Sequence, residues 1–152
     1  ISKLKLGTPV ENPTFTVTGK KAIRLVSDTE RLVSNFVANM RSEIWFARVA
    51  DGASKTDIMI TRSDTLEVTK VTTISETLQA IELSPDGRRL YALGKSRNDV
   101  YVYTIERDAT GKPLLFLIGS QQLPASGSNL LSSTDGSTIL TDIAGGYCAL
   151  SD

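Results

Sequence analysis

The chain has 152 residues, which is enough for one domain with a sizeable core. A hydrophobic content of 40% with 22% charged residues is typical of a globular protein and excludes a disordered one. Lysine plus arginine and aspartate plus glutamate both total 17, and this balance argues against a dedicated binder of nucleic acid or anionic membranes.

Strand patterns fill the chain, and no segment predicts a convincing helix. Residues 14–18 and 22–26, joined by a turn at Gly19, are predicted as the outer strands of a partial unit over residues 1–30. A whole unit is predicted over residues 31–77. Its four strands are expected at 32–38, 44–49, 57–61 and 66–74.

The next unit, residues 78–124, has the clearest turns. Pro85-Asp86-Gly87 predicts a tight turn, because proline fixes φ and glycine accepts a positive φ. The run from Val100 to Ile105 is β-branched and aromatic, which is typical of a strand covered on both faces. The strands of this unit are expected at 81–84, 90–93, 100–105 and 114–122. A last, partial unit over residues 125–152 has strands expected at 128–133, 138–143 and 147–150.

Three segments repeat one turn-plus-strand pattern, and their spacing predicts the architecture. They begin at Arg41, Asp86 and Asp135, roughly 45 and 49 residues apart, which is the spacing of β-propeller blades. We therefore expect an all-β fold made of blades of four antiparallel strands, with about three blades present. Closed propellers have about four to eight blades. The chain is therefore a piece of a longer propeller, closes by oligomerising, or packs its sheets differently, for example as a β-sandwich.

Residues 80–105 resemble a known repeat. Ala80-Ile-Glu-Leu-Ser-Pro-Asp-Gly-Arg-Arg-Leu-Tyr-Ala-Leu-Gly94, followed by Asn98-Asp-Val-Tyr-Val-Tyr-Thr-Ile105, resembles a blade of the bacterial YVTN-type repeat. The same pattern occurs in propellers resembling 6-phosphogluconolactonase. The resemblance implies a propeller, and with it either a lactone hydrolase or a non-catalytic surface or periplasmic binding protein.

Side chains with an evident catalytic role are scarce. The chain has no histidine, which removes the usual general base and the commonest transition-metal ligand. Cys148 lies in a strand pattern and is expected to be a buried structural thiol. The carboxylates of the turns lack the spacing of a calcium loop and are expected to accept hydrogen bonds from nearby backbone. We therefore predict no metal site and no cofactor.

The preferred interpretation is a non-catalytic binding module of a bacterial propeller protein that presents loops to a protein or glycan. The loops that join second to third strands lie on the same rim as the links between blades, and such loops commonly carry binding residues. The candidate binding residues are Lys55, Asp57, Lys95, Arg97, Asn98 and Asp99. The alternative is part of a lactonase-like hydrolase.

Further partners follow from the blade count. We expect the chain to associate with remaining blades of the same polypeptide or to form a homo-oligomer, and Trp45 and Tyr91 to pack between blades. Membrane insertion is not expected, because no apolar run approaches the roughly 20 residues of a spanning helix. A periplasmic or cell-surface location is favoured over the cytoplasm.

Overall fold

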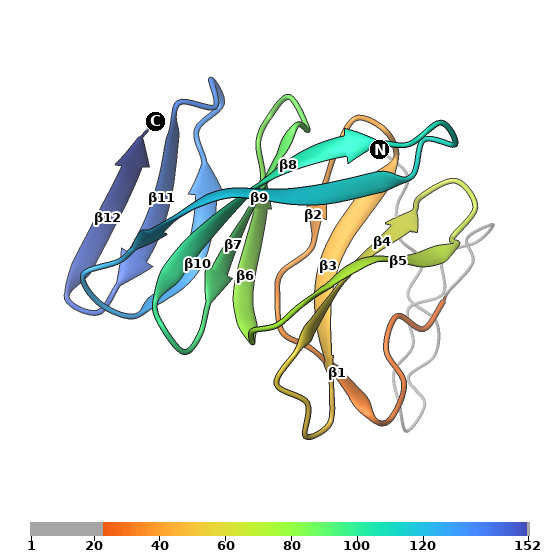
Figure 1. The fold of residues 1–152 in the computed structure, drawn as a ribbon, viewed down its shortest axis with the longest axis horizontal. Coiled ribbons are helices and arrows are strands. Elements are labelled where there is room, and N and C mark those ends of the chain that lie inside the picture. The colour runs from red at the N-terminus through yellow and green to blue at the C-terminus, as the bar shows by residue number, and fades with distance from the viewer. Residues whose placement is uncertain (1–22, 152) are drawn as a thin grey trace, which may run out of the picture.

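The computed structural model describes residues 23–151, which form three antiparallel β-sheets standing side by side (Figure 1). These residues include no helix that could span a membrane. The expected strand at 14–18 lies outside the described residues. The twelve strands are β1 (Glu30–Leu32), β2 (Val37–Ala38), β3 (Glu43–Ala50), β4 (Thr56–Arg62), β5 (Val68–Ile74), β6 (Leu78–Leu83), β7 (Arg89–Gly94), β8 (Asp99–Arg107), β9 (Pro113–Gln122), β10 (Gly127–Ser132), β11 (Thr138–Ile143) and β12 (Gly146–Ser151).

Sheet 1 comprises β1–β5, sheet 2 comprises β6–β9, and sheet 3 comprises β10–β12. Within each sheet the strands follow chain order, so every connection is a hairpin between neighbours, apart from β1 and β2, which both pair with β3. The first strands of the sheets lie next to one another, because β6 contacts β10 on one side and β2 and β3 on the other. This arrangement is that of blades around a common axis.

The first strand of sheet 1 differs from the expected continuous strand at 32–38. Leu32 pairs with Arg48 and Val37 pairs with Trp45, so the segment between them bulges away from β3. The Ser34 hydroxyl takes the place of a backbone carbonyl there and accepts a hydrogen bond from Ala47 N at 2.8 Å. The strand expected at 22–26 is also wrong, because residues 23–26 have no strand pairing.

The turn before the second strand is built alike in sheets 2 and 3. Asp86 accepts hydrogen bonds from the Ser84 hydroxyl at 2.6 Å and from Arg88 N at 3.0 Å. Asp135 accepts the equivalent bonds from Ser133 and Ser137 at the same distances. Each turn then has a glycine with positive φ, +71° and +75° respectively. The repeat inferred from the sequence is therefore present in the backbone and its hydrogen bonds.

Two apolar clusters hold the sheets together. The first joins sheets 1 and 2 and includes Trp45, Ile58, Ile81 and Leu90, all fully buried. The second joins sheets 2 and 3. Its buried members are Ala80, Tyr91, Leu93, Val100, Leu123, Leu130 and Ile139. Trp45 and Tyr91 pack between sheets as expected, although they belong to different interfaces.

Candidate binding rim

One end of the three sheets, here called the loop rim, carries the residues predicted to bind. It is formed by the connections at 51–55, 75–77, 95–98, 123–126 and 144–145. Backbone hydrogen bonds join neighbouring connections where strand pairs of sheets 2 and 3 end, from Lys95 N to Thr77 O at 2.9 Å, from Leu123 N to Asn98 O at 2.9 Å and from Ala144 N to Ser126 O at 3.0 Å. The loop rim is therefore an edge fixed by its own backbone.

Glu76 is the centre of a polar network at the first sheet junction of the loop rim. Its carboxylate accepts hydrogen bonds from the Tyr101 hydroxyl and from the Ser96 hydroxyl, the latter at 3.0 Å. Its backbone carbonyl accepts a bond from Thr56 at 2.6 Å. Burial raises the pKa of Tyr101, and the Glu76 carboxylate raises it further, so the phenol donates as a neutral group.

The carboxylate of Glu76 also explains why residue 94 is a glycine. A Cβ atom on Gly94 would lie 2.5 Å from Glu76 Oε1, so this position of β7 has room for no side chain while the network is intact. Glu76 was not among the predicted site residues. The only sequence signal for it was its place in the link between two units.

The predicted site residues divide into two groups by their contacts. Asp57 accepts a hydrogen bond from the Thr73 hydroxyl at 2.6 Å, and Asp99 lies 3.5 Å from the Tyr101 hydroxyl. Asn98, with a φ of 56°, accepts a bond from the Ser126 hydroxyl at 3.1 Å. Asp57 and Asn98 therefore help to hold the rim in shape, whereas the single Tyr101 proton is donated to Glu76 rather than to Asp99.

The second group consists of the cations Lys55, Lys95 and Arg97. All three side chains are exposed, and within residues 23–151 none of them forms a side-chain hydrogen bond or an ion pair. They are thus the predicted residues most available to a ligand. The described residues include no group of three or more carboxylate and thiol side chains that could hold a metal ion.

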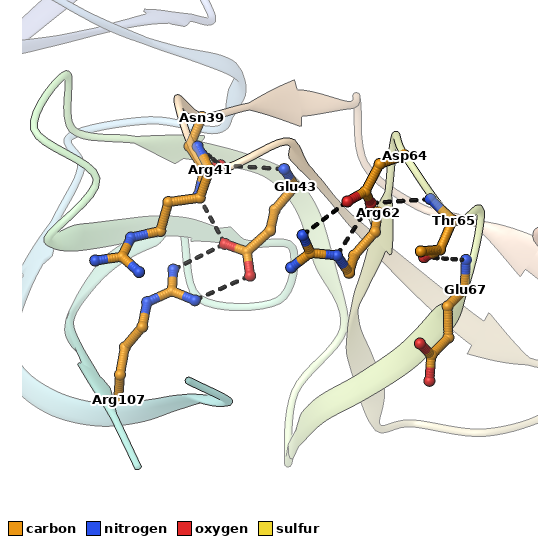
Figure 2. A network of polar contacts seen from close by, with 8 residues as sticks. All are labelled: Asn39, Arg41, Glu43, Arg62, Asp64, Thr65, Glu67 and Arg107. Carbon is orange, nitrogen blue, oxygen red and sulfur yellow. Dashed lines mark hydrogen bonds and ion pairs between the residues drawn. The ribbon is translucent and has the colours of Figure 1, made fainter. Parts of the chain in front are cut away.

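The opposite end of the sheets, here called the turn rim, has a network that the sequence did not indicate (Figure 2). It carries the turns at 39–42, 84–88 and 133–137 and the connections at 63–67 and 108–112. Arg107 of sheet 2 donates two hydrogen bonds to Glu43 of sheet 1, at 2.8 and 2.9 Å, and Asn39 donates a third at 2.9 Å. Glu43 is only 3% exposed. Burial raises the pKa of Glu43, but the hydrogen bonds from Arg107 and Asn39 outweigh burial, and the net pKa lies below its usual value.

The junction of sheets 2 and 3 is hollowed at the turn rim. A cavity of about 540 Å³ is lined by both Asp turns, Arg89 and Tyr91. A second cavity of about 310 Å³ adjoins it and extends between Val102 of β8 and Leu150 of β12. On this face β8 contributes Val100 and Val102, whereas Tyr101 and Tyr103 of the same strand pack in the cluster toward sheet 1.

Comparisons with known proteins show the fold. A putative 6-phosphogluconolactonase from Bacteroides fragilis is 18% identical, with a TM-score of 0.59, over 77% of this chain and 34% of that protein. Hydrazine synthase of Kuenenia stuttgartiensis is 17% identical, with a TM-score of 0.60, over 90% of this chain and 36% of that one. The Cps50 (Swd1) β-propeller domain of Myceliophteria thermophila is 13% identical, with a TM-score of 0.59, over 81% and 38% of the two chains.

No family model and no curated protein matches the sequence. The chain spans 34% to 38% of the length of these structural neighbours. At these identities the likeness concerns the fold alone. The protein is an all-β, incomplete β-propeller in which each sheet is a blade.

Proposed function

We propose that the chain is a non-catalytic binding module of a YVTN-type propeller and that its loop rim binds an acidic segment of a protein or glycan. One observation carries this proposal. The carboxylates of Asp57 and Glu76 accept hydrogen bonds from hydroxyl groups of the rim itself, whereas among residues 23–151 the three cations there have no such partner.

A fixed edge favours binding, because little conformational freedom is lost when a ligand is held. The backbone bonds from Lys95 to Thr77 and from Leu123 to Asn98 hold neighbouring connections together. The ligand therefore meets exposed cations on a preorganised support. Exposed charges mainly set the association rate and the salt dependence, so we expect weak binding that declines as ionic strength rises.

The test compares two charge reversals of equal size. Lys95→Glu combined with Arg97→Glu alters the loop rim, and Arg88→Glu combined with Lys112→Glu alters exposed cations at the turn rim. Binding of a fluorescent Asp/Glu-rich peptide and of a sulfated oligosaccharide is measured by anisotropy. We expect the first variant to lose binding to one of these probes and the second to retain it.

Equal loss in both variants would refute a site at the loop rim, because net charge alone would then explain binding. Lack of binding to either probe by the unaltered chain would also contradict the proposal. Hydrolysis of 6-phosphogluconolactone by the chain would support the hydrolase interpretation instead. Circular dichroism of both variants controls for folding.

A further inference from the structure

The cavity of about 540 Å³ at the turn rim, here called the turn cavity, has the size of a ligand site. Binding pockets are typically about 300–1,000 Å³. Its walls are the turn between β6 and β7, the turn between β10 and β11, and the side chains of Arg89 and Tyr91 on β7. All of these belong to the first two strands of their sheets.

A hollow between successive turns also occurs at the first sheet junction. There residues 39–41 and 85–87 line a cavity of about 140 Å³. Sheets 1 and 2 both extend to an outer strand, β5 and β9, so this hollow is present beside complete four-stranded hairpin arrays. A strand placed beside β12 would lie two strands away from the turn between β10 and β11. The turn cavity therefore belongs to the repeat of turns and not to the outer edge of sheet 3.

Tyr91 places a polar group in the wall of the turn cavity. Its side chain is 4% exposed and belongs to the apolar cluster with Leu130 and Ile139 of sheet 3, which fixes its position. The Tyr91 hydroxyl forms no hydrogen bond with residues 23–151, and it is not one of the polar atoms that are completely enclosed without a partner. It is therefore in contact with the cavity that the residue lines. A buried phenol usually has a hydrogen-bond partner, and the cavity is where a partner can reach this one.

The two turn aspartates, Asp86 and Asp135, supply hydrogen-bond acceptors to the same cavity. In each carboxylate Oδ1 accepts the hydrogen bonds of its own turn, whereas Oδ2 forms none within residues 23–151. Hydrogen bonds from serine and backbone donors of the turns lower the pKa of both carboxylates, so both are ionised at neutral pH. The guanidinium of Arg89 gives the lining a positive charge as well.

We propose that the turn cavity binds a neutral sugar unit. An anionic ligand would meet two carboxylates there, and a cationic ligand would meet the Arg89 guanidinium. A hydroxyl group donates one hydrogen bond and accepts two. A ring with several hydroxyls can therefore donate to the Oδ2 atoms of Asp86 and Asp135 while it accepts from Tyr91. This site lies at the end of the sheets opposite the loop rim, and it does not rest on the function proposed there.

The experiment titrates the chain with D-glucose, D-galactose and D-mannose and follows the amide NMR signals of Gly87 and Gly136, one in each turn. We expect a Kd on the order of 1 mM for the best of these sugars, because a single sugar unit makes few contacts. D-Glucosamine and D-glucuronate test the charge argument, and each should bind about two- to fivefold more weakly. The methyl glycosides distinguish two sources of the ligand. Unchanged affinity would assign the end of a glycan chain, and loss of binding on methylation would assign a free sugar.

Tyr91→Phe is the most specific variant, because it removes one hydroxyl and no hydrogen bond to residues 23–151. We expect it to weaken sugar binding about 2- to 10-fold and to leave Tm unchanged. Tyr103→Phe is the matched control, because it makes the same change on the face of sheet 2 toward sheet 1. It should leave sugar binding unchanged. Asp135→Asn keeps an oxygen acceptor for the turn but removes the charge, and it should weaken binding about tenfold.

Three results would overturn the proposal. The first is the absence of saturable binding of every neutral sugar tested. The second is tighter binding of D-glucosamine or D-glucuronate than of the neutral sugars, which would indicate a site for a charged ligand. The third is equal weakening by Tyr91→Phe and Tyr103→Phe, which would place the sugar elsewhere. The loop-rim variant with Lys95→Glu and Arg97→Glu should bind sugars as the unaltered chain does, so the two proposed sites can fail separately.

Discussion

Removing the Arg107 side chain should destabilise the protein through the carboxylate it leaves behind. In Arg107→Ala, Glu43 loses two charge-assisted hydrogen bonds, at 2.8 and 2.9 Å, and keeps the bond from Asn39. The Glu43 side chain is 3% exposed and that of Arg107 is 17% exposed. Water can therefore replace the guanidinium only in part, and the buried charge remains.

The magnitude follows from the burial of the pair. Breaking a buried ion pair by removing one partner costs about 3–5 kcal/mol. The retained bond from Asn39 and the partial exposure of Arg107 favour the lower end, about 3 kcal/mol. For a chain of this size each kcal/mol shifts Tm by about 2–4 °C, so we expect Tm to fall by about 6–12 °C.

Urea unfolding at pH 7 and at pH 3 to 4 is the decisive assay. The folded pKa of Glu43 is below its unfolded value, so its contribution to stability is present at neutral pH and is lost as pH falls through the folded pKa. In Arg107→Ala, burial is opposed only by the hydrogen bond from Asn39 and the more distant charge of Arg41, so the pKa of Glu43 rises. Protonation then removes the unpaired charge, so the difference in stability between the two proteins should shrink in acid.

Two results would refute this reasoning. One is a loss of unfolding free energy by Arg107→Ala at pH 7 that is no larger than the loss by Arg62→Ala. The latter variant breaks the exposed ion pair with Asp64 in the same region (Figure 2). The other is a stability difference that stays constant with pH. The double variant Glu43→Leu/Arg107→Met should be more stable than Arg107→Ala, because it leaves no buried charge unpaired.

Two further outcomes test the repeat turns. Gly87→Ala should cost about 1–2 kcal/mol because its φ of +71° is unfavourable for alanine. Gly119→Ala is the control, because φ is not positive there and no atom lies within 4 Å of the new Cβ; it should stabilise the protein slightly. If urea unfolding showed Gly87→Ala to be the more stable of the two variants, the result would contradict the turn geometry. Hydrogen bonds from serine and backbone donors lower the pKa of Asp135 to about 2. Its contribution to the stability of the folded state is therefore lost as pH falls from 4 toward 2. Asp135→Asn should therefore lack this part of the acid dependence of Tm, and an unchanged acid profile would count against it.

Much of the fold was predictable because its signals are local. The β-branched and aromatic run from Val100 to Ile105 lies within β8, and the Ser84-Pro-Asp-Gly turn recurs in sheet 3 with the same hydrogen bonds. The break between β1 and β2 was not predictable, since it depends on the Ser34 hydroxyl replacing a backbone acceptor for Ala47. The pattern of apolar and polar residues gives no sign that a side-chain hydroxyl replaces a backbone acceptor.

The polar sites were less predictable because they join distant positions. Glu43 and Arg107 are 64 residues apart, and each looks like an ordinary strand-terminal charge. The sequence pattern correctly predicted that Lys95 and Arg97 lie in a loop of the rim. It could not show that they differ from Asp99, whose carboxylate lies 3.5 Å from the Tyr101 hydroxyl. That separation depends on hydrogen-bond partners, which only the folded chain supplies.

The two sheet junctions differ at the turn rim, where the turn of sheet 1 also departs from those of sheets 2 and 3. In sheet 1 Asn39 takes the place of the serine, and its side-chain oxygen accepts bonds from Arg41 N and Glu43 N. The bond from Glu43 N corresponds to the one that the serine hydroxyl accepts from Arg89 N in sheet 2 and from Thr138 N in sheet 3. Arg41 stands where sheets 2 and 3 have the aspartate, and the nearby carboxylate is that of Glu43, the first residue of β3, which accepts hydrogen bonds from Arg107 in the next sheet. In sheet 2 the aspartate stays within its own turn, and a cavity of about 540 Å³ remains at the junction with sheet 3. A carboxylate thus crosses the junction between sheets 1 and 2, whereas between sheets 2 and 3 the nearest turn carboxylate accepts hydrogen bonds within its own turn.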